Sequence, residues 1–223
     1  MATTSAPPTR SPVPRAPQQE RGAQRMEQIL DAAEAVIAEV GVEGASVQTI
    51  AQRAGASMGS LYHFFPGKDA LVLALAERCT RRVTETNERA VGPEMLDLPL
   101  ERVFERVVTD QVSLMRQLPA FDRVHEAMHA HPAGRDIAQR MDDVLVEQVE
   151  TFLRLRFPAM PVERRQAAAR FAVHSVHAVL DCAERLAEAP RLAVLQELQT
   201  AMTRHFSAYE QQYGTAKDAA GRA

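Results

Sequence analysis

The sequence has few of the cysteines that cross-link a small protein. It contains two cysteines, Cys79 and Cys182, and no tryptophan. Neither cysteine belongs to a CxxC pair, which excludes a disulfide framework and a zinc site built from thiolates. We therefore interpret both as buried or half-buried thiols in a reducing compartment, where a free cysteine behaves as a small apolar residue.

The chain also lacks a long apolar run and an excess of positive charge. No stretch approaches the roughly 20 apolar residues that cross a bilayer. The first residues contain no apolar core of a secretory signal, so we expect a cytoplasmic protein. The net charge of −3 argues against a basic protein that coats nucleic acid. A sequence-specific DNA-binding protein is not excluded, because it needs only a local basic face.

Strands are missing from the pattern as well, since no segment alternates cleanly between apolar and polar residues. Apolar residues instead recur at steps of three and four over residues 25–40, with Glu27, Asp31, Glu34 and Glu39 expected on the solvent side. Further helices are predicted over residues 47–54, 58–64, 68–89, 98–118, 121–130, 134–157, 162–187 and 192–213. The prediction is an all-α fold with enough apolar residues, 46% of the chain, for a real core.

The helices divide into an N-terminal three-helix unit and a larger helical domain. The expected divisions are a disordered arm (1–19), a helix-turn-helix unit (20–67), a connecting helix (68–91), a larger helical domain (92–214) and a disordered tail (215–223). The arm is rich in proline and carries Arg10 and Arg15, followed by Arg21 and Arg25. Such an arm is either a solvated tail or an additional contact to DNA.

Two short predicted helices lie on either side of the tight turn Ala54-Gly55-Ala56. This is the helix-turn-helix pattern, in which the first helix braces against the DNA backbone and the second enters the major groove. Ser46 and Ser57 stand where N-caps are needed. Gly41 is expected to end the preceding helix in a left-handed conformation. The pattern alone is also common in proteins that do not bind DNA.

Residues 25–72 resemble the DNA-binding region of TetR/AcrR family transcriptional regulators. The resemblance rests on Ile29-Leu30-Asp31-Ala32-Ala33, Gly41, Ser46–Ala51, Ala54–Ser57, Gly59-Ser60-Leu61-Tyr62-His63-Phe64-Phe65 and Lys68-Asp69-Ala70-Leu71. It implies that Gln48, Met58 and Ser60 face base edges or nearby phosphates. It implies that Ser46, Tyr62, His63 and Lys68 grip the backbone of double-stranded DNA. With Ser57 and Gly59 at the start of the second helix, these are the predicted DNA-binding residues. One departure is that residues 21–90 carry about as many acids as bases.

The same resemblance implies a homodimer that binds a near-palindromic operator. In this family the last two helices, here about residues 162–187 and 192–213, form a four-helix bundle with those of the partner. Their apolar stripes contain Val173, Val176, Val179, Leu180, Leu192, Leu195, Leu198, Met202 and Phe206. A small-molecule effector held in the C-terminal domain is expected to release the repressor from DNA. Repression is the expected sign of control, although the family also permits activation.

Candidate residues for the effector pocket lie on the apolar faces of the C-terminal helices. They are Phe104, Val108, Met115, Phe121, His125, Met128, Met141, Leu145, Phe152, Phe171, His174 and His177. Most residues at such spacing serve as core, and a subset is expected to line a cavity for a small hydrophobic or aromatic molecule. Whether the cluster of His125, His129, His131, His174 and His177 binds a ligand or a metal stays open.

Two other functions are alternatives to the repressor. The segment His125-Glu126-Ala127-Met128-His129 matches the HExxH pattern of zinc proteases. Such enzymes need a third protein ligand and a strand that aligns the substrate, and Pro132 stands where the extended motif would continue. The other alternative is a DNA-bound assembly protein without an effector. The prediction is a regulator with no catalytic residue, no metal and no cofactor.

Overall fold

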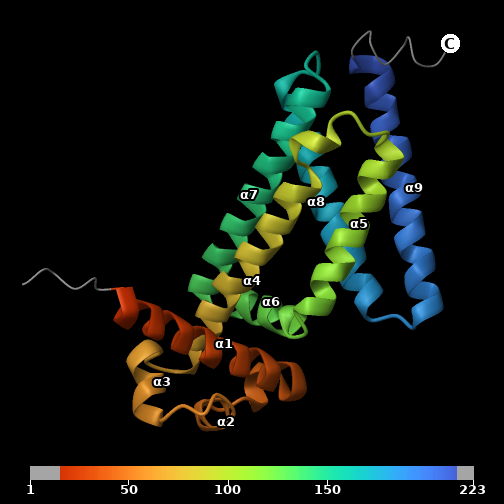
Figure 1. Ribbon diagram of the computed structural model, residues 1–223. Coiled ribbons are helices and arrows are strands. Elements are labelled where there is room, and N and C mark those ends of the chain that lie inside the picture. The colour runs from red at the N-terminus through yellow and green to blue at the C-terminus, as the bar shows by residue number, and fades with distance from the viewer. Residues whose placement is uncertain (1–15, 215–223) are drawn as a thin grey trace, which may run out of the picture.

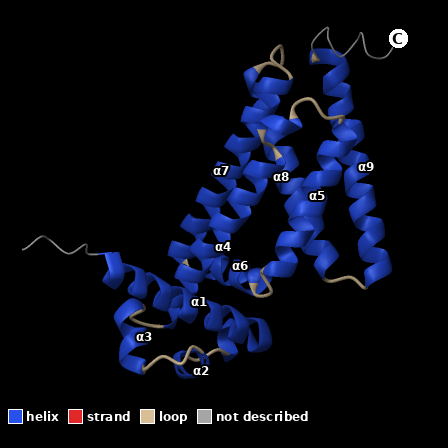
Figure 2. Ribbon diagram, viewed as in Figure 1, coloured by secondary structure: helices blue, strands red, loops and turns tan. Residues whose placement is uncertain are grey.

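The computed structural model describes residues 16–214, and within them it contains helices and loops but no strand (Figures 1 and 2). The elements are α1 (Ala16–Gly44), α2 (Val47–Arg53), α3 (Met58–Phe64), α4 (Lys68–Ala90), the 3-10 turn η1 (Pro93–Met95), α5 (Leu100–Gln117), α6 (Phe121–Ala130), α7 (Pro132–Arg156), α8 (Val162–Glu184) and α9 (Glu188–Tyr213). The all-α prediction is confirmed. Each helix in this range is too short or too polar to cross a bilayer.

The chain has two differently shaped parts that are joined by α4. Helices α1, α2 and α3 form a small unit at one end, and α5, α7, α8 and α9 stand beside one another as a taller bundle, with the short α6 across its lower end (Figure 1). Helix α4 packs on α1 at one end and on α5, α6 and α7 along its length. One continuous apolar core therefore runs through both parts.

The first helix begins earlier than the sequence pattern predicts. It starts at Ala16, so residues 16–19 of the expected disordered arm belong to α1. Residues 17–21 read Pro-Gln-Gln-Glu-Arg, in which the proline occupies the first turn, where its missing N–H costs nothing, and the others are good helix formers. Residues 1–15, with Arg10 and Arg15, and residues 215–223 lie outside the described part of the chain.

Prolines also explain the other shifted helix boundaries. Pro132 lies two residues before the predicted start of its helix and opens α7, because proline is well suited to the first helical position. His131 caps this helix, since its Nδ1 accepts a hydrogen bond from the backbone N–H of Ala133 over 3.2 Å. Helix α9 likewise begins at Glu188 and holds Pro190 in its first turn. Gly41 has the predicted positive φ of 77°, and a further helical turn continues beyond it to Gly44.

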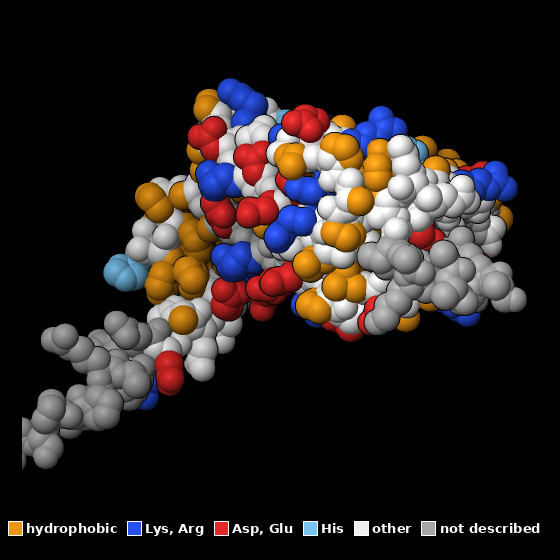
Figure 3. All heavy atoms as spheres, turned by 90° about the horizontal axis from the view of Figure 1, so that it is seen from above, with side chains coloured by type: hydrophobic (Ala, Val, Ile, Leu, Met, Phe, Trp, Pro, Cys, Tyr) orange, Lys and Arg blue, Asp and Glu red, His pale blue; other side chains and the backbone are white. Residues whose placement is uncertain are grey.

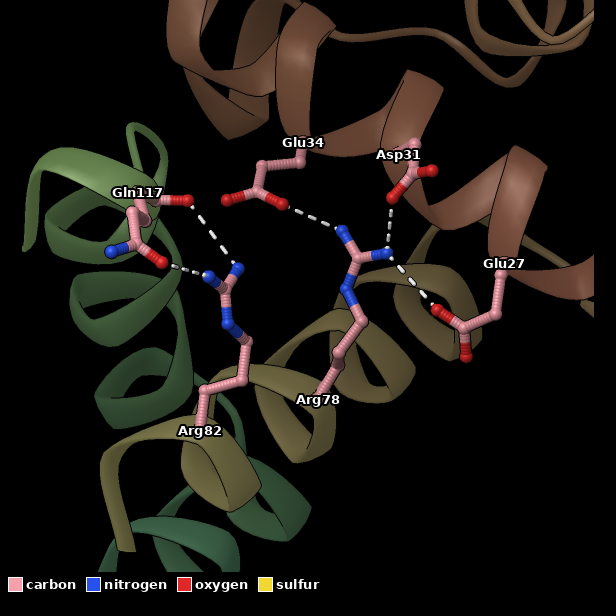
Figure 4. A network of polar contacts seen from close by, with 6 residues as sticks. All are labelled: Glu27, Asp31, Glu34, Arg78, Arg82 and Gln117. Carbon is pink, nitrogen blue, oxygen red and sulfur yellow. Dashed lines mark hydrogen bonds and ion pairs between the residues drawn. The ribbon is translucent and has the colours of Figure 1, made fainter. Parts of the chain in front are cut away.

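The junction between the two parts is built around Arg78 of α4, which is only 8% exposed. Its Nη1 lies 2.6 Å from Asp31 Oδ1 and 3.3 Å from Glu27 Oε2, and its Nη2 lies 2.6 Å from Glu34 Oε2 (Figure 4). The expectation that the acids of α1 face solvent is wrong for Glu34. The Glu27 and Asp31 side chains remain 47% and 73% exposed while they pair with Arg78. Glu34 is itself buried, with 8% of its surface exposed.

A second arginine, one turn further along α4, ties the same helix to α5. Arg82 donates from Nη2 to Gln117 Oε1 over 3.1 Å and from Nη1 to the Gln117 carbonyl oxygen over 3.3 Å (Figure 4). Arg78 and Arg82 thus point from neighbouring turns towards different helices. Together they fix the angle at which the small unit meets the bundle.

The upper end of the bundle, seen from above, mixes acidic and basic side chains with apolar ones between them (Figure 3). No charge of one sign dominates the face that this view shows. That distribution does not favour a polyanion such as DNA at this end of the molecule.

We predict that Arg78→Ala lowers the free energy of unfolding by about 3 kcal/mol, because it leaves the buried Glu34 carboxylate without a counter-ion. Arg82→Ala is the matched control on the next turn, and it is expected to cost about 1 kcal/mol for its hydrogen bonds to an uncharged partner. Urea unfolding followed by circular dichroism measures both. Equal losses in the two variants would contradict the central role of Arg78.

Candidate nucleic-acid interface and ligand cavity

The two short helices of the N-terminal unit are held by their caps and by a few buried side chains. Ser46 Oγ accepts a hydrogen bond from the Thr49 N–H, and Ser57 Oγ accepts one from the Ser60 N–H, both over 3.1 Å. Helices α2 and α3 have seven residues each, which is too short to be stable alone. The hydroxyls of Ser46 and Ser57 therefore have a structural role in addition to their predicted place in the DNA interface.

The turn between these helices is fixed by an arginine of α1. Gly55 has a φ of 56°, a conformation that glycine adopts without strain. The Arg25 guanidinium donates to the carbonyl oxygen of Ala54 over 3.2 Å and to that of Gly55. Arg25, which follows the predicted arm in sequence, therefore satisfies the carbonyls that end α2.

The predicted DNA-binding residues of α3 lie on its outer side, while Leu61 anchors the inner side with no exposed surface. Tyr62 is 48% exposed. Gln48, Ser57, Gly59 and His63 are also exposed, and Ser46, Met58, Ser60 and Lys68 are half-buried. A Cβ atom added at Gly59 would have no heavy atom within 4 Å. The fold itself therefore does not require glycine at this position.

Two of the basic side chains in this unit are engaged within the chain. Lys68 Nζ donates to the Glu43 carbonyl oxygen over 3.2 Å, which joins the start of α4 to the end of α1. Arg53 Nη1 lies 2.6 Å from Glu39 Oε1, and this hydrogen bond lowers the pKa of Glu39. The outer face of α3 carries no lysine or arginine, so it offers shape and neutral hydrogen-bonding groups rather than charge.

A cavity of about 810 Å³ lies in the larger part, bounded by residues of α4, α5, α6, α7 and α8. Its lining includes six of the predicted pocket residues: Met115, Phe121, His125, Met141, His174 and His177. His129 lines it as well. The sequence pattern did not identify the carboxylates of the lining, which are Asp122, Glu126, Asp142, Asp181 and Glu184.

A much smaller apolar cavity of about 50 Å³ lies further along the bundle. Phe104, Leu145 and Phe152 line it, together with residues of α8 and α9. Gln111 and His177 line both cavities, so the two spaces lie on either side of these side chains.

Three predicted pocket residues line neither cavity. Val108 and Met128 are buried in the core, with 5% and 2% of their surfaces exposed. Phe171 is 47% exposed on the outside of α8, where its ring lies 4.7 Å from the ring of His205, so its prediction as a pocket residue is wrong. Helical spacing identifies apolar residues but does not decide whether they face core, cavity or solvent.

The segment that resembles a zinc-protease motif lies on α6. The rings of His125 and His129 pack edge to face with centroids 4.7 Å apart. Among residues 16–214, no group of three or more histidine, cysteine and acidic side chains is arranged to hold a metal ion. The hydrolase alternative therefore finds no geometric support in this part of the chain.

Buried titratable groups have shifted pKa values. Burial raises the pKa of the Cys79 thiol to about 11, so it stays protonated and unreactive at neutral pH. Burial also lowers the pKa of His125 and that of His177, which favours the neutral imidazole in both. Cys182, in contrast, is exposed, so its interpretation as a buried or half-buried thiol is wrong.

Helix α6 connects the large cavity to the N-terminal unit. Its Phe121, Asp122, His125 and Glu126 line the cavity. From the same helix, Arg123 Nη1 donates to the Ile37 carbonyl oxygen of α1 over 3.2 Å. A shift of α6 would therefore be felt directly by the helix that supports α2 and α3.

Comparisons with known proteins match both parts of the chain. The family model for bacterial regulatory proteins of the tetR family matches residues 29–75, and the model for the tetracyclin repressor-like C-terminal domain matches residues 99–205. The HTH-type transcriptional repressor AcnR of Corynebacterium diphtheriae is 38% identical over 143 residues, which are 58% of this chain and 75% of that protein.

Other relatives are matched over a smaller share of their length. The HTH-type nicotine-responsive transcriptional repressor HdnoR of Paenarthrobacter nicotinovorans is 34% identical over 98 residues, 42% of this chain and 50% of that protein. An HTH-type transcriptional repressor of Mycobacterium tuberculosis is 42% identical over 67 residues, 30% of this chain and 36% of that protein. The chain thus spans half or less of these two proteins.

Solved structures show the same fold at lower identity. A TetR-family transcriptional regulator from Mesorhizobium loti superposes with a TM-score of 0.70 at 15% identity, over 87% of this chain and 99% of that one. The regulator LfrR of Mycobacterium smegmatis, solved in complex with proflavine, gives a TM-score of 0.55 at 23% identity, over 83% and 96% of the two chains.

Proposed function

From the fact that this chain belongs to the TetR family of DNA-binding transcriptional regulators, we propose that it is a repressor. As a homodimer it binds a near-palindromic operator through α3, and a small molecule in the large cavity releases it. The observation that carries the DNA-binding part is the outer face of α3. There Tyr62 is 48% exposed and Gly59 has open space around it, so neither residue is needed by the core.

The outer face of α3 suits recognition of DNA by close fit combined with hydrogen bonds. The capped start of α3 presents Met58, Gly59 and Ser60 to a major groove that is about 12 Å wide and admits one helix. Few charges are free to neutralise phosphates, so the affinity is expected to depend on close fit and hydrogen bonds. The hydroxyl of Tyr62 is the natural donor to a phosphate oxygen at the rim of the groove.

The experiment is selection of bound duplexes from a random DNA library by the purified full chain, followed by affinity measurement at two salt concentrations. We predict a short palindrome that Tyr62→Phe binds about tenfold more weakly, because one hydrogen bond to a charged oxygen is lost. Recovery of no specific sequence by the folded dimer would contradict the proposal.

A substitution at Gly59 provides a sharper test, because its expected effects on protein stability and on DNA affinity have opposite signs. Gly59→Ala is expected to stabilise the free protein by up to about 1 kcal/mol, since alanine favours the helix and the added methyl group meets no neighbour. The same methyl group is expected to weaken DNA binding by keeping α3 away from the groove. Gly22→Ala on α1, which also has open space, is the control. Unchanged DNA affinity in Gly59→Ala would show that this face does not approach the bases.

The proposed dimer uses the outer faces of α8 and α9. Of the expected stripe residues, Leu192 is 54% exposed on α9 and Val179 is half-buried on α8. The other seven are buried within the single chain: Val173, Val176, Leu180, Leu195, Leu198, Met202 and Phe206. The middle of α8 also exposes Phe171, with exposed Ala167 and Ala178 one and two turns away. A large apolar ring among small side chains is a suitable centre for a helix–helix interface.

We predict that Phe171→Glu converts the dimer into a monomer, because it buries a charge at the centre of the interface. Val40→Glu changes a valine that is 53% exposed on α1, away from α8 and α9, and should leave the dimer intact. Sedimentation velocity at micromolar concentration distinguishes the two. A dimeric Phe171→Glu variant would place the interface elsewhere.

The effector part of the proposal is supported by the cavity and by its link to α1. A space of about 810 Å³ is large enough for a drug-sized molecule. Its wall α6 contacts α1 through Arg123, so occupancy of the cavity and the position of α2 and α3 are mechanically connected. The proflavine complex of LfrR and the nicotine-responsive name of HdnoR are examples of small-molecule recognition among related regulators. The cavity favours an effector-controlled repressor over a DNA-bound assembly protein.

A further inference from the structure

The large cavity has an excess of negative charge that the chain itself does not neutralise. Five carboxylates line it, together with two guanidinium groups, those of Arg123 and Arg185. Arg185 Nη2 lies 2.8 Å from both carboxylate oxygens of Asp181, and Arg123 is directed to α1. Among residues 16–214, the other four carboxylates, those of Asp122, Glu126, Asp142 and Glu184, form no ion pair with lysine or arginine.

Two histidines of the lining, His125 and His177, do not compensate for this charge at neutral pH. His177 Nδ1 lies 3.9 Å from Asp142 Oδ1, but burial lowers the pKa of His177 and keeps it largely neutral. Burial lowers the pKa of His125 in the same way. Burial, followed by the charge of Asp181, raises the pKa of Asp122 against the smaller opposing effects of His125 and Arg185.

An independent feature indicates that the cavity is built to receive a polar ligand. Gln111 is only 4% exposed and lines both cavities. Within the described part of the chain, its side-chain amide makes no hydrogen bond. The amide is open to the cavity, so its donor and acceptor groups are free to pair with a ligand that fills this space.

The aromatic groups of the cavity favour a flat ligand. The rings of Phe121 and His125 lie nearly parallel, with an interplanar angle of 21° and centroids 5.6 Å apart, and His129 packs edge-on against His125. Met115 and Met141 add polarisable side chains to the lining. The face of an aromatic ring attracts cations, so the rings and the carboxylates select for the same kind of molecule.

We propose that this cavity binds a planar aromatic organic cation, with its rings against Phe121 and its positive charge beside Asp142. The inference deepens the proposed function, because it assigns a chemical class to the effector, and it narrows the hydrophobic or aromatic molecule expected from the sequence. A metal ion is not the occupant favoured here, since no group of three ligands is arranged for one within residues 16–214.

The test is the binding of three ring systems of similar shape but different charge to the full chain at pH 7.5, without DNA. N-methylacridinium is a cation, acridine is neutral at this pH and anthracene-9-carboxylate is an anion. Isothermal titration is expected to give one cation bound per chain, at least about tenfold more tightly than acridine, because a nearby unpaired carboxylate contributes that much or more. The anion is expected not to bind. Equal affinities for cation and neutral compound would overturn the inference.

A pair of adjacent substitutions on α7 locates the site. Asp142→Asn removes a carboxylate that lines the cavity. It is expected to weaken the binding of N-methylacridinium about tenfold and to leave the affinity for acridine unchanged. Asp143→Asn is the matched control, because this exposed residue accepts a hydrogen bond from Gln139 and does not line the cavity. An equal loss of affinity in both variants, or no loss in Asp142→Asn, would contradict the proposed position of the cation beside Asp142.

Failure of this inference can be told apart from failure of the proposed function. The titrations contain no DNA, and the DNA selection contains no ligand. Specific DNA binding without cation binding would overturn the inference alone. Cation binding that depends on Asp142, by a chain that selects no DNA sequence, would support the inference and contradict the repressor.

Discussion

The buried guanidinium group of Arg78 is the contact on which the arrangement of this molecule depends. Helix α4 belongs to both parts of the chain, and Arg78 holds it against α1 through Glu27, Asp31 and Glu34. The Glu34 carboxylate shares its burial, so loss of either partner would leave the other charge unpaired in the interior. The N-terminal unit therefore follows α4 as a rigid body.

A ligand-controlled regulator needs such stiffness at one junction and mobility at another. Helix α6 lines the cavity on one side and reaches α1 on the other, where Arg123 donates to the Ile37 carbonyl oxygen over 3.2 Å. This contact lies one turn before Gly41, where α1 departs from helical geometry. In our account, ligand binding shifts α6 and α4, and the Arg78 contact carries the shift to α2 and α3. Two such units in a dimer would then change their separation on DNA.

Local features of this chain could be predicted from sequence, because they depend on neighbouring residues. The caps Ser46 and Ser57, the left-handed Gly41 and the order of the helices all follow from short-range rules and were predicted correctly. Contacts between distant segments could not be predicted from the sequence. The ion pairs of Arg78, the use of Arg25 on the Ala54 carbonyl oxygen, the acids around the cavity and the exposure of Phe171 depend on how helices pack, which periodicity does not encode.

The most direct test of the account is the coupling between the two sites, measured in both directions. The affinity of the dimer for its selected DNA is determined with and without saturating N-methylacridinium, and the affinity for N-methylacridinium with and without that DNA. We predict that the cation lowers the affinity for DNA and that DNA lowers the affinity for the cation by the same factor, because thermodynamic linkage makes the coupling between two sites reciprocal. A cation that binds fully and leaves the DNA affinity unchanged would contradict it.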